Sequence, residues 1–316
     1  MRRGFQRRLL EWFDRHQREL PWRQDRDPYR VWLSEVMLQQ TRVAAVTNHY
    51  RKFLRRFPTI EKLASARESS VLAAWSGLGY YRRARMLHAT ARKIVTEHGG
   101  RFPGNAEDLR ALPGVGRYTA AAIASIAFNE PVAVVDGNVE RVLQRVQGKN
   151  LAGEELWRAA GELLHRRRPG DFNQAMMELG ATLCLPRQPQ CLLCPVSDLC
   201  ATRGELRKSL KKSRQIKQEI RYALACRDGV TFMVKRPKTA ARMPGMWELP
   251  ETTSANGTAA AWLTLRHSIT VTDYLVHVMQ SLPPDGVDGR WVKNSQITTL
   301  PLTGLTRKIL RAAKII

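Results

Sequence analysis

Four cysteines crowd into one short stretch of this chain of 316 residues. Cys184, Cys191, Cys194 and Cys200 are separated by six, two and five residues. So tight a group is unlike the disulfide framework of a secreted protein and favours metal or cluster ligation. Unequal spacers let one loop wrap a 4Fe-4S cluster, whereas structural zinc usually takes two Cys-x-x-Cys pairs, and here there is one. The spacing favours the iron–sulfur cluster and leaves zinc as the alternative.

Helical patterns fill the first two thirds of the chain. Asp27 can cap a helix whose first turn holds Pro28, where the missing N–H of proline costs nothing. Gly and Pro breakers separate the later patterns. These cover residues 60–75, 80–98, 106–111, 117–128, 137–147, 153–166 and 171–183. Residues 1–202 are therefore predicted to form an all-α domain.

The composition changes after this helical part. Residues 203–219 are polar, basic and poor in large apolar side chains, which predicts a linker. From there two runs of β-forming residues flank Asp228-Gly229, a strong hairpin signal. Residues 220–316 are predicted to form a small α+β domain.

Three further features belong to that second domain. Residues 266–280 have a strand pattern, and a terminal helix is expected after Pro301. Cys226 falls in an expected strand, where a small core residue is a simpler interpretation than a metal ligand.

The charge balance indicates a polyanionic partner. The chain has 52 Lys and Arg against 28 Asp and Glu, a net charge of +24. Arginines are interleaved with Trp and Tyr across whole helices, which favours nucleic acid over an anionic membrane. No apolar run approaches the ~18 residues of a membrane span, and the first residues read as an amphipathic helix and not as a signal peptide. We expect a soluble, intracellular (cytoplasmic) protein without a membrane partner.

A glycine turn, LPGVGRYTA, leads into the helix expected from residue 117. Gly114 and Gly116 let backbone N–H groups approach a phosphate, and the helix start adds its positive end. An ordinary helix–helix connection is the alternative. Asp136 follows twenty residues after Gly116, near another helix start. It is either a functional carboxylate or a plain N-cap.

Glu35 is the second candidate carboxylate. On the helix that starts at Pro28, helical spacing puts Glu35 on one face with Val31, Trp32 and Leu38. Burial beside Trp and aliphatic side chains should raise its pKa, which suits a general acid near neutral pH. The alternative is a solvated glutamate on an amphipathic helix.

Several motifs together resemble the helix-hairpin-helix DNA glycosylases, in the branch of endonuclease III and MutY. Besides the glycine turn and the cysteine loop at 184–200, they are SEVMLQQT (34–41), GLGYYRRA (77–84), VDGNV (135–139) and NQAMMELGA (173–181). Within the branch they resemble the adenine DNA glycosylases, over about 200 residues. The resemblance implies a core of two helical subdomains with an iron–sulfur loop. More loosely, KRP (235–237) and GMWELP (245–250) resemble the Nudix-like recognition domain of that family.

One position separates the two branches. Endonuclease III relatives have a lysine where this chain has Tyr118, and tyrosine cannot form the imine through which that lysine cuts the strand. A monofunctional, hydrolytic glycosylase is implied, acting on adenine mispaired with 8-oxoguanine or guanine in base excision repair. The alternatives are a bifunctional lyase for oxidised pyrimidines and a non-catalytic DNA-binding or redox-sensing protein. The C-terminal region also lacks a glutamate-rich Nudix box, so pyrophosphatase activity is not expected.

The resemblance assigns roles to individual residues. A flipped adenine would be protonated at N7 by Glu35, while Asp136 stabilises the oxocarbenium-like sugar. Further residues are implied near the reacting nucleotide: Arg23 and Gln174 in the adenine pocket, Tyr118 beside the nucleotide, Asn138 near Glu35, and Gln40, Thr41, Leu78 and Tyr80 in the gap of the duplex. The implied partner is double-stranded DNA with an adenine mispair, bound by a monomer that associates with the nucleoid through DNA.

The C-terminal domain departs from the family at one loop. Where MutY relatives read 8-oxoguanine with Phe-Ser-His, this chain aligns Ile269, Thr270 and Val271. Thr270 keeps a hydroxyl for hydrogen bonding, whereas the imidazole is lost. We expect a smaller preference for 8-oxoguanine over guanine, unless the alignment is shifted or His267 takes the role.

Overall fold

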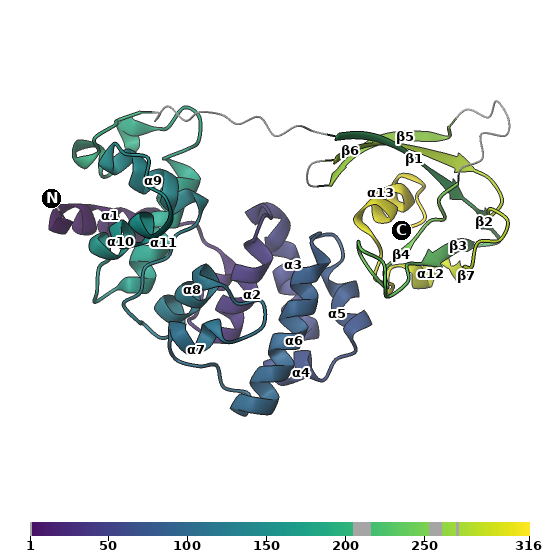
Figure 1. Ribbon diagram of the computed structural model, residues 1–316, viewed down its shortest axis with the longest axis horizontal. Coiled ribbons are helices and arrows are strands. Elements are labelled where there is room, and N and C mark those ends of the chain that lie inside the picture. The colour runs from purple at the N-terminus through teal and green to yellow at the C-terminus, as the bar shows by residue number, and fades with distance from the viewer. Residues whose placement is uncertain (1, 205–215, 253–260, 270–271) are drawn as a thin grey trace. The chain divides into compact units, whose positions relative to one another are not determined.

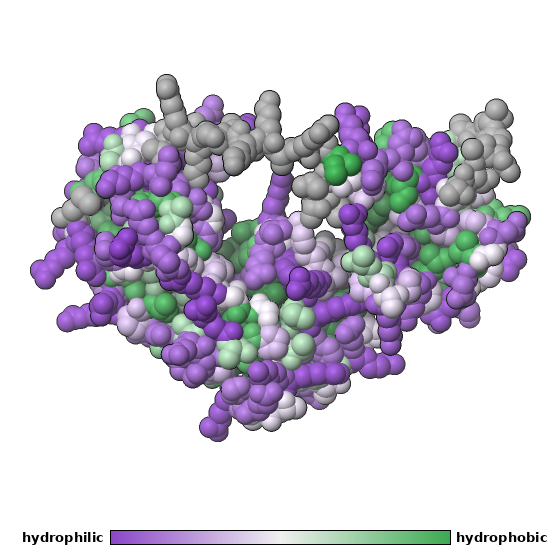
Figure 2. Space-filling view, in the orientation of Figure 1, coloured by the Kyte–Doolittle hydropathy of each residue, from purple (hydrophilic) through white to green (hydrophobic). Residues whose placement is uncertain are grey.

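A computed structural model describes residues 2–204, 216–252, 261–269 and 272–316. The chain divides into two compact units, one of Met1–Ala64 with Met86–Ser209 and one of Ser65–Arg85 with Leu210–Ile316 (Figure 1). None of the described helices has the length and apolar character needed to cross a membrane. The visible face of each unit is mostly hydrophilic (Figure 2).

Every regular element in the described part of the first unit is helical, as predicted for residues 1–202. Figure 1 labels the α-helices. They are α1 (Arg2–His16), α2 (Pro28–Leu38), α3 (Val43–Arg56), α4 (Ile60–Ala64), α6 (Tyr81–His98, which begins in the second unit), α7 (Ala106–Arg110), α8 (Arg117–Ala127), α9 (Gly137–Gln147), α10 (Gly153–Leu163) and α11 (Pro169–Thr182). Helices α1, α9, α10 and α11 pack together, and α2 packs on α3 and α8. These two groups agree with the two helical subdomains that were predicted.

Short polar signals set the ends of the helices that matter most. The Asp27 carboxylate accepts the N–H of Arg30 at the start of α2, and Pro28 is the first helical residue, as predicted. Asp136 caps α9 in the same manner. Helix α9 ends at Gln147, and the residue that follows it, Gly148, has a left-handed φ of 67°, which favours glycine.

Residues 60–75 do not form the single helix that was predicted. The chain forms α4 and then α5 (Glu68–Trp75), with Arg67 in extended conformation as the residue before α5. An extended residue cannot continue the helical hydrogen-bond ladder, so the two helices are separate. Helix α5 belongs to the second unit.

The second unit combines two small sheets with helices. Its strands are β1 (Ile216–Leu224), β2 (Cys226–Arg227), β3 (Val230–Lys235), β4 (Trp247–Glu248), β5 (Leu263–Ile269), β6 (Thr272–Gln280) and β7 (Arg290–Lys293), followed by helices α12 (Asn294–Ile297) and α13 (Gly304–Ala312). One sheet has the order β1-β6-β5, with β1 parallel to β6, and the other joins β2, β3, β4 and β7. Figure 1 shows α13 between the sheets, where Ile309 packs in one buried core with Val276 and Met233.

The strand predictions are confirmed in part. Asp228 and Gly229, with φ of 46° and 73°, form the tight turn of the β2–β3 hairpin. Residues 266–280 are not one strand but parts of β5 and β6, which pair antiparallel with Ile269 opposite Thr272. Both strands alternate in the same way, so periodicity gives no sign of the reversal between them. Thr270 and Val271 lie outside the described residues.

Two further expectations for this unit are corrected. β1 begins at Ile216, inside the predicted linker, because its pairing with β6 extends to Thr272. Cys226 is exposed and not in the core, since β2 is a two-residue strand beside the hairpin turn. The predicted terminal helix is α13.

Gly180 tests the packing of α9 against α11. A Cβ at Gly180 would lie 2.6 Å from the Cβ of Asn138, so Gly180→Ala should lower the free energy of unfolding by about 1–3 kcal/mol. Gly161→Ala is the matched control, because a Cβ there meets nothing within 4 Å and alanine favours helix by about 0.5–1 kcal/mol. Denaturant unfolding measures both. Equal effects of the two substitutions would contradict tight packing at Gly180.

Candidate active site

An open pocket lies where α2 and α8 meet α9 and α11, the two helical groups of the first unit. It encloses about 1380 Å³, its mouth included. Eight of the residues predicted from the sequence line it: Arg23, Glu35, Gln40, Thr41, Tyr118, Asp136, Asn138 and Gln174. The fold therefore gathers candidates that are up to 151 residues apart in sequence (Arg23 to Gln174).

Glu35 is the buried acid of this pocket. Its residue is 6% exposed, and the hydroxyl of Tyr118 donates a hydrogen bond to Oε2 at 2.6 Å. Burial raises the pKa of Glu35 to about 7, and the negative charge of Asp136 adds to this rise. The hydrogen bond from Tyr118 and the cation of Arg23 act in the opposite direction and lower the pKa. The predicted upward shift is thus present, and it allows Glu35 to hold a proton near neutral pH.

Tyr118 reaches Glu35 from the first turn of α8. Besides donating to the carboxyl, its hydroxyl lies 3.2 Å from the sulfur of Met177 on α11. Burial and then the nearby carboxylates raise the pKa of Tyr118 well above its usual value, so the phenol keeps its proton. A neutral O–H donor therefore lies beside the Glu35 carboxyl.

Asp136 is both the N-cap of α9 and part of the pocket wall, so the two interpretations of it are compatible. Oδ1 accepts the backbone N–H groups of Asn138 and Val139 at 2.9 and 2.8 Å. Oδ2 accepts the side-chain amide of Asn138 at 2.9 Å. Hydrogen bonds at both oxygens hold the carboxylate in one orientation.

An ion triad around the buried Glu178 forms another side of the pocket, and sequence reasoning missed two of its members. Glu178 accepts from Arg18 Nε at 2.7 Å and from Arg23 Nη2 at 2.9 Å, with its side chain 1% exposed. Burial alone would raise the pKa of Glu178, but the bonds from Arg18 and Arg23 outweigh it and lower the pKa to about 2. Glu178 lies four residues after Gln174 on α11, a spacing that could have placed both on one face.

The other predicted residues are not among the described residues that line this pocket. Gly114 (φ 71°) and Gly116 form the turn before α8; a Cβ at Gly116 would meet nothing within 4 Å, so its backbone is open to approach. Leu78 and Tyr80 belong to the second unit, where Leu78 is buried and Tyr80 is 47% exposed. Thr270 lies outside the described residues.

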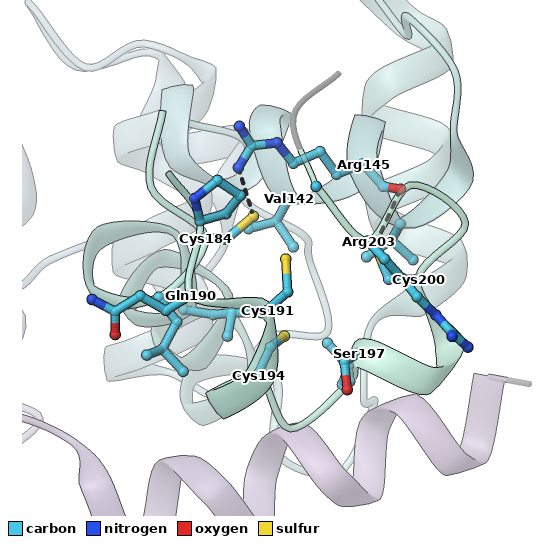
Figure 3. Close-up of a pocket in the computed structure, with 15 residues that line it drawn as sticks. Val142, Arg145, Cys184, Gln190, Cys191, Cys194, Ser197, Cys200 and Arg203 are labelled. Carbon is cyan, nitrogen blue, oxygen red and sulfur yellow. Dashed lines mark hydrogen bonds between the residues drawn. The ribbon is translucent and has the colours of Figure 1, made fainter. Parts of the chain in front are cut away.

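The four cysteines of the loop line a second, smaller pocket (Figure 3). The figure shows the sulfur atoms of Cys184, Cys191 and Cys194 directed toward the same hollow, while the thiol of Cys200 contacts the carbonyl of Arg145 at 3.3 Å. Within the described ranges, no three His, Cys, Asp or Glu side chains gather closely enough to hold one metal ion. The four cysteines thus line one pocket from separate points of the loop.

Arginine side chains of helix α9 form hydrogen bonds to this loop, and one of them also bonds to a residue of the first pocket. Arg145 donates to the carbonyls of Leu185 and Pro186 at 2.7 and 3.0 Å. Arg141, also missed from the sequence, donates to the side-chain oxygen of Asn138 at 2.8 Å and to the carbonyl of Cys184 at 2.7 Å. One arginine thus bonds a pocket residue and the first cysteine of the loop.

Known proteins match this chain in sequence. Residues 33–164 match the HhH-GPD superfamily of base excision DNA repair proteins. The adenine DNA glycosylase of Homo sapiens is 52% identical over 215 residues, 63% of this chain and 39% of that protein. The adenine DNA glycosylase of Buchnera aphidicola subsp. Acyrthosiphon pisum is 34% identical over 247 residues, 73% of this chain and 69% of that protein. The chain thus spans about two fifths of the length of the human relative.

Solved structures agree with the helical fold. A thermostable thymine-DNA glycosylase superposes with a TM-score of 0.61 at 34% identity, over 64% of this chain and 96% of that one. A non-covalent endonuclease III–DNA complex superposes with a TM-score of 0.56 at 24% identity, over 64% and 94%, and supports the fold alone. The sequence motifs, the helical core and these relatives agree, and the chain belongs to the adenine DNA glycosylase family within the HhH-GPD superfamily.

Proposed function

We propose that this protein is a monofunctional DNA glycosylase, which hydrolyses the N-glycosidic bond of adenine mispaired with 8-oxoguanine or guanine in duplex DNA. The observation that carries the proposal is the buried Glu35 carboxyl, with a pKa of about 7, in one pocket with the fixed carboxylate of Asp136. Family membership supports the same activity. The net charge of +24 suits a polyanionic substrate.

Glu35 is the proposed general acid. Adenine leaves poorly as an anion, and a proton on N7 turns it into a neutral leaving group. The target base must leave the stack to reach a buried carboxyl. Tyr118 donates to Oε2 and holds that oxygen in place, so we assign the acidic proton to Oε1.

Asp136 is the proposed stabiliser of the sugar cation. As the bond to adenine lengthens, positive charge develops on the sugar, and a nearby fixed carboxylate stabilises it without reorganising. Asn138 and Val139 hold both Asp136 oxygens before substrate arrives. One protonated and one ionised carboxyl group thus divide the work, as in sugar hydrolysis.

The pocket favours hydrolysis over strand cleavage. A bifunctional lyase needs an amine that can form an imine with the sugar. Among the described residues that line the pocket there is no lysine, and its cations are Arg18 and Arg23. Gln174 and the Arg18–Glu178–Arg23 triad are proposed to hydrogen-bond the flipped base.

The cysteine loop fits a 4Fe-4S cluster. Four thiolates are the donor set that such a cluster takes, and Cys184, Cys191, Cys194 and Cys200 line one pocket. When bound, the cluster would cross-link the loop and so stabilise its fold. We also propose that the strands from β1 onward belong to a Nudix-like domain that reads the base opposite adenine, Thr270 included.

A gel assay tests the activity. With a duplex containing adenine opposite 8-oxoguanine, the parent protein should leave an abasic site that breaks only after alkali. Strand breakage without alkali would indicate a lyase. Binding without base release would indicate a non-catalytic DNA-binding protein.

In the same assay, Glu35→Gln should lose about two to four orders of magnitude in single-turnover rate, because an amide cannot donate the proton. Its affinity for the duplex should stay near that of the parent. Glu155→Gln, an exposed glutamate on α10, is the matched control and should be fully active. A Glu35→Gln rate near the parental one would remove Glu35 from the mechanism.

The pH profile tests the contact between Tyr118 and Glu35. The acid form of Glu35 is lost as pH rises through its pKa, so the single-turnover rate should fall above about pH 7. Tyr118→Phe removes a hydrogen bond that favours the carboxylate, so the pKa should rise and the fall should move to higher pH. A shift to lower pH would contradict this role of Tyr118. The residual rate of Glu35→Gln should show no such fall.

Metal analysis tests the cluster. The purified protein should be yellow-brown and contain about four irons per chain. Cys194→Ser should lower the iron content and the melting temperature, whereas Cys226→Ser, at an exposed cysteine of the second unit, should change neither. One zinc and no iron would establish the zinc alternative instead.

A further inference from the structure

The segment Gly77–Tyr80, here called the GLGY turn, has an unusual backbone. Gly77, Gly79 and Tyr80 have φ of 108°, 69° and 47°. For tyrosine a left-handed conformation is strained, and such strain persists where surrounding contacts determine it. Tyr80 is nevertheless 47% exposed, so its own ring packing is not what holds it.

Local contacts hold the inner side of the turn. Arg83 Nη2 donates to the carbonyls of Leu78 and Gly79 at 3.1 and 3.3 Å. The indole N–H of Trp75 also donates to the Gly79 carbonyl, at 3.1 Å. The Arg83 guanidinium lies 5.4 Å from the ring centre of Tyr80 and the same distance from that of Trp75. These contacts fix the shape of the turn.

The two residues that bracket the turn bond instead to the C-terminal part of the same unit. The Tyr81 hydroxyl donates to the Leu302 carbonyl at 2.6 Å, and the Ser76 hydroxyl donates to the same oxygen at 3.2 Å. Arg307 Nε donates to Ser76 Oγ at 3.0 Å. Ser76 and Tyr81 are each 4% exposed. This set of bonds among Ser76, Tyr81, Leu302 and Arg307 is called the turn latch below.

Backbone hydrogen bonds and a helix cap hold the C-terminal residues of the turn latch, Leu302 and Arg307. Leu302 forms an isolated parallel β-bridge with Trp247. The N–H of Trp247 donates to the carbonyl of Pro301, and the carbonyl of Trp247 accepts the N–H of Thr303. Thr303 caps α13, the helix that carries Arg307. The carbonyl and the guanidinium that bond to the turn are thus fixed by one strand and the start of one helix.

We propose that Leu302 and Arg307 are positioning residues for the GLGY turn, and that through Ser76 and Tyr81 they present the Tyr80 ring to duplex DNA. The role of Tyr80 in the gap of the duplex is the one that the family resemblance implies, and it rests on the proposed function; the turn latch is a feature of the protein without DNA. An aromatic ring held in place before binding loses less conformational freedom on insertion between bases. The C-terminal residues thereby contribute to DNA binding through the turn, without touching the DNA themselves.

Amide hydrogen exchange of the DNA-free protein tests the turn latch itself. Tyr81→Phe removes one hydroxyl, and Arg307→Ala removes the bond to Ser76. Either should speed exchange of the Leu78 and Arg83 amides by about threefold to tenfold, the scale of one lost hydrogen bond. Arg311→Ala removes the same charge from an exposed position of α13 and is the matched control. Unchanged exchange in both turn-latch variants would overturn the proposal.

A double-mutant cycle separates positioning from general stability. Arg307→Ala should lower single-turnover adenine release, or the affinity for mispaired duplex, by about threefold to tenfold. In a Tyr80→Ala background it should cost almost nothing more, because its effect passes through that ring. Arg307→Lys, which keeps one donor, should restore part of the loss. An equal loss in both backgrounds would mean that Arg307 is merely structural and would overturn the proposal.

The two proposals fail in different ways. A parent protein that releases no adenine contradicts the proposed function, and the exchange measurement still decides whether the turn latch exists. A parent that is active, with an additive double-mutant cycle, contradicts the positioning role alone.

Discussion

The close contact between α9 and α11 determines where the candidate site forms. Gly180 has no side chain, so the backbone of α11 approaches Asn138 on α9. That approach brings the start of α9, with Asp136, to the face of α11 that carries Gln174 and Glu178. Both edges of the pocket therefore depend on one residue whose only contribution is its small size. A larger side chain would separate the two sides before altering any polar group.

The pocket also illustrates how environment sets the behaviour of a carboxyl group. Glu35 and Glu178 line the same pocket, and both are buried. Glu35 has one phenol donor beside it, and burial raises its pKa to about 7. Glu178 has two arginines, which lower its pKa to about 2. Pairs of carboxyl groups whose pKa values are shifted in opposite directions are typical of sites that move protons. Because the arginines of the triad keep Glu178 ionised, it does not compete with Glu35 for the proton.

Much of the helical unit could be predicted because its signals are local. The caps at Asp27 and Asp136, the Asp228-Gly229 hairpin and the buried environment of Glu35 follow from residues within one or two turns. The break at Arg67 and the reversal between Ile269 and Thr272 could not be predicted in this way. Helical periodicity continues across Arg67, and strand alternation continues across the reversal, so neither change is visible in the sequence pattern.

The site was predicted less completely than the fold, for the same reason. Arg18 and Arg141 act through partners 160 and 39 residues away, at Glu178 and Gly180. Nothing near either arginine in sequence distinguishes it from the many others in this basic chain. Their importance follows from which carboxylate or carbonyl the fold brings to them.

The cysteine loop is closed at both ends by backbone bonds. The Cys184 N–H donates to Leu179 at the end of α11, and the N–H groups of Ala201 and Thr202 donate to Val146 and Arg145 at the end of α9. Zinc-finger peptides, in contrast, have no such frame and fold when the metal arrives. These backbone bonds hold both ends of the loop to α9 and α11 without using any thiol, so a cluster bound there would join a loop that is already attached to the helices at both ends.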